Sequence, residues 1–313
     1  MTPSIQTVSV IGHGAMGAVY ASILHTTDRN CISFLAGGQR FERLCRDGVI
    51  VNGKHHPIPV LRPEDRSSPA DLVIVAVKHH HLDDAIRDME NRVGEKTTIL
   101  SVMNGIESEE RIGAVYGMDK VLYAVAVGID AVRVGNRINY ASQGEILFGE
   151  AKNPSLTERV RRVQALFHRA GITYETPTDM VRTLWWKFMI NVGINQASAA
   201  LRAPYSVFQN AQGARELMES AMREVIALAN KANVHLSETD LATWYTILAR
   251  LNPQGKTSML QDVEAGRKTE VEMFAGKVIE LGRHYHLPTP VNERLFELIK
   301  EIEGSYARER AGT

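Results

Sequence analysis

The sequence has little of several features that mark whole classes of protein. Two cysteines among 313 residues, Cys31 and Cys45, cannot form a disulfide framework or a zinc site, and we expect both to be buried, reduced thiols. The 36 Lys and Arg residues are balanced by 36 Asp and Glu residues, so no broad positive field favours a nucleic-acid or membrane partner. No run approaches the roughly 18 apolar residues of a membrane span, and no secretory signal opens the chain. We therefore expect a cytoplasmic protein with small-molecule partners.

What the sequence does have is a change of hydrophobic pattern near its middle. The first half alternates short β-branched apolar runs with helix-like segments, which predicts βα units in a mainly parallel sheet. Two later runs, at 138–141 and 145–148, predict a hairpin-like addition to that sheet. The predicted parallel strands lie at residues 8–11, 32–35, 72–77, 98–102 and 121–127.

Three glycines follow the first predicted strand at the spacing of a dinucleotide-binding turn. The segment Ile11-Gly12-His13-Gly14-Ala15-Met16-Gly17 continues into a predicted helix. In this pattern Gly12 permits a tight turn, Gly14 lets the backbone approach a pyrophosphate, and Gly17 lets helix and strand pack closely. The helix N-terminus then faces the anion. The plainer alternative is a tight βα turn that binds nothing.

The turn-prone residues 176–179 end the alternating pattern. After them, apolar residues recur three and four apart, as they do along helices, with breaks near residues 204, 252–255 and 287–290. We therefore predict an α/β fold in two parts. A Rossmann-type dinucleotide-binding domain spans residues 1–178, and an all-helical substrate and catalytic domain spans residues 179–313.

The end of the second predicted strand bears on the choice of cofactor. Enzymes selective for NAD usually place an acidic residue there, on the ribose hydroxyls. This chain instead has Phe34-Leu35-Ala36-Gly37-Gly38-Gln39-Arg40. Because no carboxylate repels a 2′-phosphate and Arg40 is within reach, NADP is predicted over NAD. Alternatively, Arg40 is a solvated helix residue that pairs with Glu42 or Asp47.

Three polar residues interrupt an apolar helix in the second half. Lys187, Asn191 and Asn195 are four apart, so on a helix they follow one stripe. Trp185 and Trp186 precede the lysine, and burial among such residues lowers a lysine pKa, which prepares it as a general acid. The alternative is a lysine that snorkels to solvent and two asparagines that bond a neighbouring helix.

A second polar constellation begins another predicted helix. Ser258 and Gln261 match a capping box, which predicts Ser258 as the N-cap of a helix whose end also faces a substrate carboxylate. Glu270 lies three residues after Arg267, and an ordinary surface ion pair is the plainer interpretation of the two.

Further candidates follow two strands of the predicted sheet. Lys78 comes after residues 72–77, and Asn104-Gly105 comes after the next strand, at carboxyl ends where open α/β sheets bind ligands. The histidines at 79–81 are consecutive and so point to different faces of a helix. No Cys, His or carboxylate set has the spacing of metal ligands, and we predict no metal.

The ordered set of motifs resembles the ketopantoate reductase (2-dehydropantoate 2-reductase) family along nearly the whole chain. The resemblance is carried by the glycine turn, Val77-Lys78, Asn104-Gly105, Lys187-x-x-x-Asn191-x-x-x-Asn195, Ser258-Met259-Leu260-Gln261-Asp262 and Glu270. It implies NADPH-dependent reduction of a 2-oxo acid to a 2-hydroxy acid, giving pantoate on the way to pantothenate and coenzyme A. The open alternatives are a reductase of a different 2-oxo acid and a dinucleotide-sensing protein without catalysis.

The resemblance also implies roles for individual residues. Separately, the apolar faces of the helices in the second part can pack within one chain or between two, so a homodimer is one of two open alternatives. Lys187 is similar to the family's general acid and Glu270 to its helper carboxylate. The implied substrate contacts are Asn104, Lys187, Asn191, Asn195 and Ser258. The implied cofactor contacts are Gly12, His13, Gly14, Ala15, Met16, Gly17, Arg40, Lys78, Asn104 and Ala131.

Four positions depart from the family's pattern. Gly37 stands where members commonly place an arginine for the 2′-phosphate, so Arg40 is expected to substitute for it. Gln196 stands where many members have a proline. Tyr205 and Gly255 stand where some members present asparagines toward the substrate.

Overall fold

The computed structural model describes residues 4–66 and 68–311. The chain divides into two compact units, Met1–Val181 and Arg182–Thr313. The first unit ends at Val181, whereas the sequence analysis placed the boundary after residue 178.

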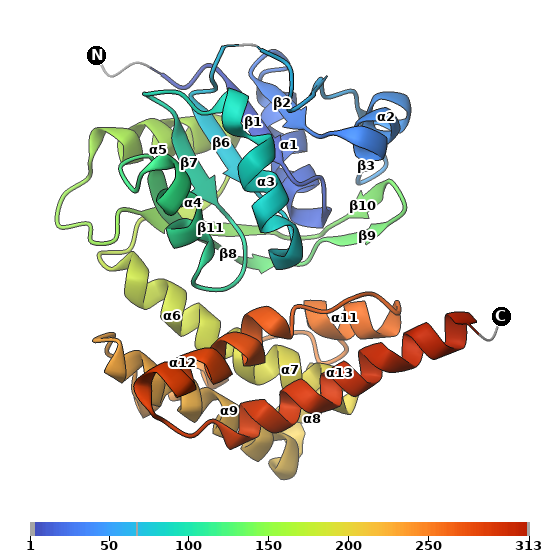
Figure 1. Ribbon diagram of the computed structural model, residues 1–313, viewed down its shortest axis with the longest axis vertical. Helices are drawn as coiled ribbons and strands as arrows, with labels where there is room; N and C mark the ends of the chain where they lie inside the picture. The colour runs from blue at the N-terminus through green and yellow to red at the C-terminus, as the bar shows by residue number, and fades with distance from the viewer. Residues whose placement is uncertain (1–3, 67, 312–313) are drawn as a thin grey trace. The chain divides into compact units, whose positions relative to one another are not determined.

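The first unit is built on a mainly parallel sheet with the strand order β12-β11-β8-β7-β6-β1-β2-β5 (Figure 1). The pair β8 and β11 is antiparallel. The strands are β1 (Val8–Ile11), β2 (Ile32–Leu35), β5 (Val60–Leu61), β6 (Leu72–Val75), β7 (Thr98–Ser101), β8 (Val121–Ile129), β11 (Gln143–Gly149) and β12 (Tyr174–Glu175). The helices are α1 (Ala15–Thr27), α2 (Gly38–Asp47), η1 (His79–His81), α3 (Leu82–Asp88), η2 (Glu90–Arg92), α4 (Ser108–Tyr116) and α5 (Glu158–Ala170). The predicted α/β fold is confirmed.

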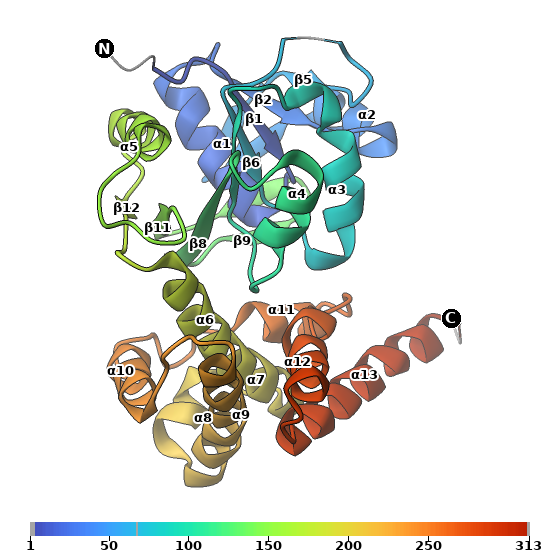
Figure 2. The same cartoon turned by 60° about the vertical axis from the view of Figure 1, so that its left-hand side comes forward.

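Alternate residues of the central strands point to opposite faces of the sheet, and each face has its own apolar core. Leu72 and Ile74 of β6 are buried in the core that also contains residues of α1 and α5. Val73 and Val75 are buried in the core on the other face, with residues of α3 and α4. Figure 2 shows α1 and α5 on one side of the sheet and α3 and α4 on the other.

A second, smaller sheet has the strand order β4-β3-β10-β9 and was not predicted. Its strands are β3 (Val49–Val51), β4 (Lys54–His56), β9 (Val132–Val134) and β10 (Arg137–Asn139). The predicted hairpin between residues 138–141 and 145–148 is wrong, because β10 pairs with β3 and β9 whereas β11 pairs with β8. The carboxylate of Asp130 accepts hydrogen bonds from the backbone N–H groups of Ala141 and Ser142, at 2.9 and 2.8 Å, where the chain passes from one sheet to the other.

In its described residues the second unit contains helices joined by loops and no strand, as predicted (Figures 1 and 2). Two of its segments, η3 and η4, are π-helical turns. Its helices end and restart at the predicted breaks. They are α6 (Met180–Ile190), η3 (Asn191–Asn195), α7 (Gln196–Leu201), α8 (Tyr205–Asn210), α9 (Gln212–Lys231), α10 (Glu238–Leu248), α11 (Ser258–Glu264), η4 (Glu272–Gly276), α12 (Lys277–Tyr285) and α13 (Pro290–Ala311).

Two expectations drawn from composition have different outcomes. Within the described residues, every helix is too short or too polar to cross a membrane. Cys31 is buried in the first unit, but Cys45 is exposed, so the expected burial is wrong for the second cysteine. The reason lies in α2, whose one buried residue is Leu44. The neighbouring Cys45 therefore faces away from the core.

Candidate functional site

The glycine turn joins β1 to α1, and its backbone requires glycine at two positions. Gly12 has φ of +102°, and a Cβ atom there would lie 2.4 Å from the carbonyl oxygen of Ala76. A Cβ atom at Gly17 would lie 1.9 Å from the carbonyl oxygen of Gly12. The turn, the first helix and the segment after β6 are therefore packed backbone against backbone.

Gly14 lies in a different environment, in which a Cβ atom would meet nothing within 4 Å. It is the N-cap of α1, and no side chain caps that helix end. The N–H groups of the first turn of this 13-residue helix therefore face open space, where they can donate to an anion. Both the space and the donors fit a pyrophosphate group.

The carboxyl edge of the main sheet carries the other predicted cofactor residues. The chain passes from β1 to β2 on one side and later returns to β6 on the other, so β1 lies at a topological switch point, where such sheets bind ligands. Lys78 follows β6, Asn104 follows β7 and Ala131 follows β8. Because β1, β6, β7 and β8 are parallel neighbours, the fold brings these residues and the glycine turn to one edge.

Arginine side chains surround the second residue of the glycine turn. Arg133 of β9 donates through Nη1 to the carbonyl oxygen of His13, and through Nε to that of Gly135 at 2.7 Å. Burial, followed by the positive charges of Arg133, Arg43 and Arg40, lowers the pKa of His13 to about 4. His13 is therefore neutral at neutral pH, and the positive charge beside the turn belongs to the guanidinium groups.

Sequence analysis singled out Arg40 but missed two of these arginines. Arg40 and Arg43 are three apart on α2, a spacing that puts both on one side of a helix and was available as a signal. Arg133 had no such signal, because it comes from the second sheet, whose short strands were not predicted.

Arg40 is exposed on α2, and its Nη2 lies 3.1 Å from Nε2 of His81, which follows β6. The predicted alternative, a pair with Glu42 or Asp47, is wrong. In the described chain these two carboxylates pair with other arginines, at 3.5 and 2.8 Å respectively.

Lys187 lies in α6 of the second unit, half-buried beside the aromatic residues that precede and follow it. The rings of Trp185 and Phe188 pack edge to face with centroids 6.1 Å apart. Burial lowers the pKa of Lys187 from 10.5 to about 8, the direction that the sequence predicted. A proton on this amine is therefore more easily given up than a proton on an exposed lysine.

The helix that carries Lys187 changes to π form at Asn191–Asn195, whereas the sequence predicted a regular α-helix. Asn191 and Asn195 are both buried, and Nδ2 of Asn195 donates to Oδ1 of Asn191 at 3.1 Å. Gly193 lets α9 approach this turn, because a Cβ atom there would lie 2.5 Å from Cε of Met222. Single π turns are rare and occur frequently at functional sites.

A buried amide connects this π turn to the rest of the second unit. Gln196 is 0% exposed. Its Nε2 donates to the carbonyl oxygen of Val192 at 2.8 Å and to Oδ1 of Asn292 at 2.9 Å. Its Oε1 accepts from the backbone N–H of Ala275 at 2.9 Å. One side chain thus joins η3, η4 and α13.

Ser258 is the first residue of α11 and is exposed, so the prediction that it is the N-cap is wrong by one residue. The cap is Thr257, whose Oγ1 accepts from the backbone N–H of Leu260 at 3.1 Å. Thr257 also donates to Oγ of Ser198 at 3.1 Å, which fixes α11 to α7. The Ser258 hydroxyl therefore does not serve as a cap.

Glu270 precedes the second π turn, and its carbonyl oxygen accepts from the backbone N–H groups of Met273 and Phe274 at 3.0 and 3.1 Å. The predicted pair of Glu270 with Arg267 is wrong. The intervening residues form a loop rather than a helical turn, and Arg267 pairs with Asp262 at 2.9 Å.

Within the second unit, the predicted substrate residues come from three connected elements. The hydrogen bond from Thr257 to Ser198 joins the start of α11 to α7, and the hydrogen bond from Ala275 to Gln196 joins η4 to α7. The helix α7 directly continues α6 and η3, which carry Lys187, Asn191 and Asn195. Ser258 begins α11, and Glu270 lies two residues before η4. The remaining predicted substrate contact, Asn104, belongs to the first unit.

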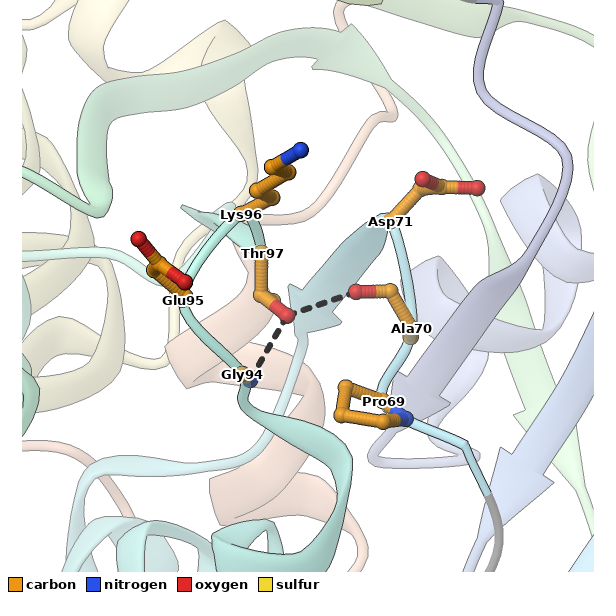
Figure 3. A pocket seen from close by; sticks show the side chains of 7 residues that line it. All are labelled: Pro69, Ala70, Asp71, Gly94, Glu95, Lys96 and Thr97. Atoms are coloured by element: carbon orange, nitrogen blue, oxygen red, sulfur yellow. Dashed lines mark hydrogen bonds between the residues drawn. The ribbon is translucent and has the colours of Figure 1, made fainter.

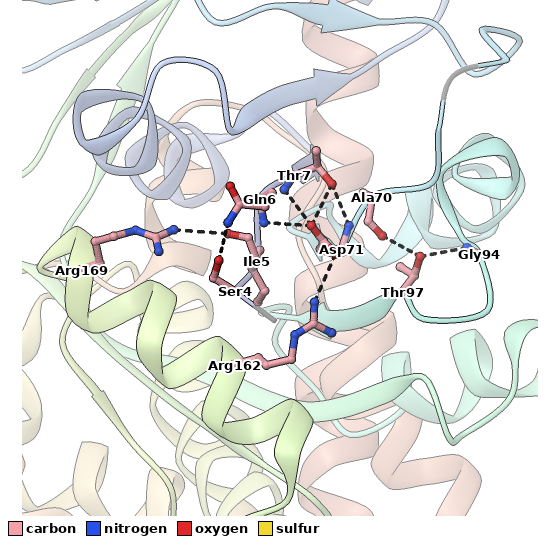
Figure 4. Close-up of polar contacts among 10 residues, drawn as sticks. All are labelled: Ser4, Ile5, Gln6, Thr7, Ala70, Asp71, Gly94, Thr97, Arg162 and Arg169. Atoms are coloured by element: carbon pink, nitrogen blue, oxygen red, sulfur yellow. Dashed lines mark hydrogen bonds and ion pairs between the residues drawn. The ribbon is translucent and has the colours of Figure 1, made fainter. Parts of the chain in front are cut away.

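A pocket of about 250 Å³ lies at the amino ends of β6 and β7, the edge of the sheet opposite the glycine turn (Figure 3). Oγ1 of Thr97 donates to the carbonyl oxygen of Ala70 at 2.6 Å and accepts from the N–H of Gly94 at 2.8 Å. The carboxylate of Asp71 accepts from two backbone N–H groups near the N-terminus and from Arg162 at 3.2 Å (Figure 4). The Thr97 hydroxyl and the Asp71 carboxylate are thus both engaged within the protein.

Two models of known protein families together match most of the chain. Residues 8–153 match the model described as Ketopantoate reductase PanE/ApbA, and residues 179–303 match Ketopantoate reductase PanE/ApbA C terminal. The 2-dehydropantoate 2-reductase of Aquifex aeolicus is 26% identical over 302 residues, which cover 94% of this chain and 96% of the relative.

Solved structures of other proteins are also similar to this chain over nearly its whole length. The 2-dehydropantoate 2-reductase from Geobacter metallireducens is similar with a TM-score of 0.84 at 25% identity, covering 94% of this chain and 99% of that chain. A D-mandelate dehydrogenase, solved with NADH and anilino(oxo)acetate, is similar with a TM-score of 0.86 at 19% identity, covering 96% of this chain and 99% of that chain. At that identity the likeness concerns the fold alone.

Proposed function

This chain belongs to the ketopantoate reductase family, and we propose that it reduces 2-dehydropantoate to pantoate, a step toward pantothenate and coenzyme A. The observation that carries the proposal is Lys187, a half-buried lysine whose pKa burial lowers to about 8, directly before a buried asparagine pair. Relatives named for this reaction match nearly the whole chain, which supports the same assignment.

The glycine turn is proposed to hold the dinucleotide. The open space beside Gly14 and the uncapped start of α1 would receive its pyrophosphate. When bound, the reduced nicotinamide would supply the hydride. Lys78, Asn104 and Ala131, at the carboxyl edge of the sheet, would position the remainder, together with the other proposed contacts Gly12, His13, Ala15, Met16, Gly17 and Arg40.

Lys187 is proposed as the general acid. Negative charge develops on the ketone oxygen as its carbon is reduced, and an ammonium group beside that oxygen stabilises the charge and donates the proton from Nζ. With a pKa of about 8, the amine is mostly protonated at neutral pH and gives up its proton readily. Glu270 is proposed as the carboxylate that assists near the substrate.

The substrate contacts are proposed to come from the π turn and the start of α11. Asn191 and Asn195 are buried, and their mutual hydrogen bond fixes the orientation of both amides. Amide groups of this kind can bind the hydroxyl and carboxylate oxygens of an oxo acid. Ser258, which caps no helix, adds a hydroxyl donor on α11.

We propose NADP as the cofactor and NAD as the weaker one. The support is the absence of a carboxylate after β2, in Ala36-Gly37-Gly38, together with the arginines around His13. A 2′-phosphate meets no repulsion there and finds positive charge nearby.

A second candidate, reduction of a different 2-oxo acid, is favoured by one observation. Tyr205 and Gly255, which stand where some family members present asparagines, pack on each other. The N–H of Tyr205 donates to the carbonyl oxygen of Gly255 at 3.1 Å, and a Cβ atom at Gly255 would lie 3.0 Å from the tyrosine ring. An aromatic ring in that position favours a more apolar substrate than asparagine would.

The test follows nicotinamide absorbance in purified protein supplied with a panel of 2-oxo acids and each reduced cofactor. We expect the highest kcat/KM for 2-dehydropantoate with NADPH. A higher kcat/KM for another oxo acid would support the second candidate. Dinucleotide binding without turnover of any oxo acid would instead identify a sensing protein.

The expected homodimer is a separate proposal about this chain. Sedimentation equilibrium across a range of protein concentrations tests it directly. A mass of twice 34.8 kDa is the expected result, and a mass of 34.8 kDa at every concentration would contradict it.

A further inference from the structure

We propose that Arg43 and Arg133 form an anion site beside the glycine turn that binds the 2′-phosphate of NADP, in place of an arginine directly after β2. The inference rests on the proposed function for the identity of the dinucleotide. It does not depend on which oxo acid is reduced. It deepens the proposed NADP preference, because it assigns that preference to one residue of α2 and one residue of the second sheet.

The second sheet positions Arg133. Its guanidinium donates to the carbonyl oxygen of His13, between the first two glycines of the turn, and to that of Gly135 at 2.7 Å. Both acceptors are neutral, and in the described chain no carboxylate pairs with this side chain. A half-buried guanidinium thus lies beside the dinucleotide turn with its charge uncompensated.

Arg43 reaches the same place from α2, the helix that follows β2. Arg43 lies three residues after Arg40 and therefore on the same side of α2; after burial, its positive charge contributes to lowering the pKa values of His13 and Arg133. The carboxylates of α2 near Arg43 are those of Glu42 and Asp47. Glu42 pairs with Arg62 at 3.5 Å, and Arg46 binds both oxygens of Asp47 at 2.8 Å. In the described chain Arg43 forms no ion pair with either carboxylate, although its charge adds to the hydrogen bond from Arg46 in lowering the pKa of Asp47.

Two guanidinium groups near each other repel when no carboxylate pairs with them. A bound ligand that carries negative charge offsets this repulsion. A phosphate is the anion that arginine binds best, through two parallel hydrogen bonds. The pyrophosphate of a dinucleotide has its own place at Gly14 and the start of α1. The helix after the second strand is where such folds accommodate the 2′-phosphate, which assigns that group to this site.

Arg40 fits the role less well than its two neighbours do. Its guanidinium lies 3.1 Å from the His81 ring, and its positive charge partly opposes the rise in the pKa of Asp88 that burial causes. It is therefore turned toward the segment after β6, and we assign it a supporting contribution to the positive potential.

Calorimetric titration of the full chain with 2′,5′-ADP and with 5′-AMP isolates the 2′-phosphate from the rest of the cofactor. The wild-type protein should bind 2′,5′-ADP at least about tenfold more tightly than 5′-AMP. Arg43→Gln and Arg133→Gln should each weaken 2′,5′-ADP by about tenfold, or 1.4 kcal/mol, and leave 5′-AMP nearly unchanged. Arg46→Gln, on the same helix but paired with Asp47, is the matched control and should change neither.

Three results would overturn the proposal. They are equal affinities of the wild type for the two probes, an unchanged preference in Arg43→Gln, and equal weakening of both probes in Arg133→Gln, which would mean that this arginine only supports the turn. If Arg133→Gln does not fold, Arg43→Gln alone decides, because that side chain is exposed. A retained 2′-phosphate preference without turnover of any oxo acid would refute the proposed function and leave this inference standing. If the protein reduces an oxo acid with NADPH and Arg43→Gln leaves that turnover unchanged, the proposed function stands and this inference is refuted.

Discussion

The glycine turn of the first unit and the polar helix of the second unit are built by different means. The turn depends on the missing Cβ atoms of Gly12 and Gly17, which let Gly12 approach the backbone of Ala76 and Gly17 approach that of Gly12. The polar helix depends on distant residues. Its π turn is joined to η4 and α13 through Gln196, and to α9 through the close approach of Met222 to Gly193. The glycines of the turn can thus be recognised from their spacing alone, whereas the proposed catalytic helix depends on side-chain contacts with several other helices of its unit.

The largest effect should separate chemistry from cofactor binding. Lys187→Ala removes the proposed proton donor from the second unit and leaves the glycine turn intact. We expect kcat to fall by about 10²–10⁴-fold. The dissociation constant of NADPH, measured by fluorescence titration, should change little. An unchanged kcat would refute the general-acid role. A loss of NADPH affinity as large as the loss of kcat would show that Lys187 also contributes to cofactor binding.

The next effect should distinguish the two uses of glycine within the turn. Gly17→Ala places a Cβ atom against the backbone of Gly12 and should lower the free energy of unfolding by about 3–4 kcal/mol. Gly14→Ala meets nothing within 4 Å and should cost less than about 1 kcal/mol, yet it should weaken NADPH binding by roughly tenfold or more because the Cβ enters the pyrophosphate space. Urea denaturation and fluorescence titration measure the two quantities. Equal destabilisation by both variants would contradict the packing described.

A smaller effect should show that the polar helix depends on distant contacts. Gln196→Ala leaves the Ala275 N–H and the Asn292 side chain without their partner in a buried region, and should lower the free energy of unfolding by about 2–3 kcal/mol. The KM for the oxo acid should rise while the NADPH dissociation constant stays constant. Gln212→Ala, at the exposed start of α9, is the control. A stability loss with no change in KM would limit Gln196 to a structural role.

The smallest effect concerns two buried titratable groups, one in each unit. Burial raises the pKa of Glu109 in α4 to about 7, so this carboxyl stays protonated in the folded state at pH values where the unfolded chain has lost the proton. Its contribution to stability is present below about pH 4.5 and is lost as the pH rises through about 7. Lys187 acts in the opposite direction, because its lowered pKa makes stability rise between about pH 8 and 10.5.

Denaturation at a series of pH values checks the Glu109 prediction. Glu109→Gln should be more stable than wild type by on the order of 2 kcal/mol at about pH 8, and the difference should shrink toward about pH 5. The neighbouring Glu110→Gln is the control, because Glu110 is exposed and should show no such trend. A pH-independent difference between Glu109→Gln and wild type would show that Glu109 is not protonated in the folded protein.

The same contrast explains what could be predicted from the sequence. The strands at 8–11 and 32–35 and the glycine turn were predicted at their observed positions, because apolar runs and glycine spacing act over a few residues. The second sheet was missed because its strands have three residues each, too few for a pattern. The N-cap of α11 was misplaced because Thr257 and Ser258 are both cap-forming residues, and the contact of Thr257 with Ser198 is a tertiary one that the sequence does not reveal.

The elements of the site that were missed all depend on tertiary contacts. Neither π turn has a local signal, since each is fixed by the packing of other helices against it. Arg133 lies 120 residues from the His13 carbonyl oxygen that it binds, so no spacing in the sequence relates the two. The identities of Lys187, Asn191 and Asn195 could be read from the sequence, but the turn that holds the asparagines could not.

The rate of hydride transfer in single turnovers, measured against pH, tests the role of Lys187 most directly. Because the proton donor must carry its proton, the rate should be constant at neutral pH and fall as the pH rises through about 8. In Lys187→Arg, whose guanidinium stays charged, the residual rate should no longer fall in that range. A wild-type rate that does not change between about pH 7 and 9, or a decline that persists in Lys187→Arg, would show that another group donates the proton.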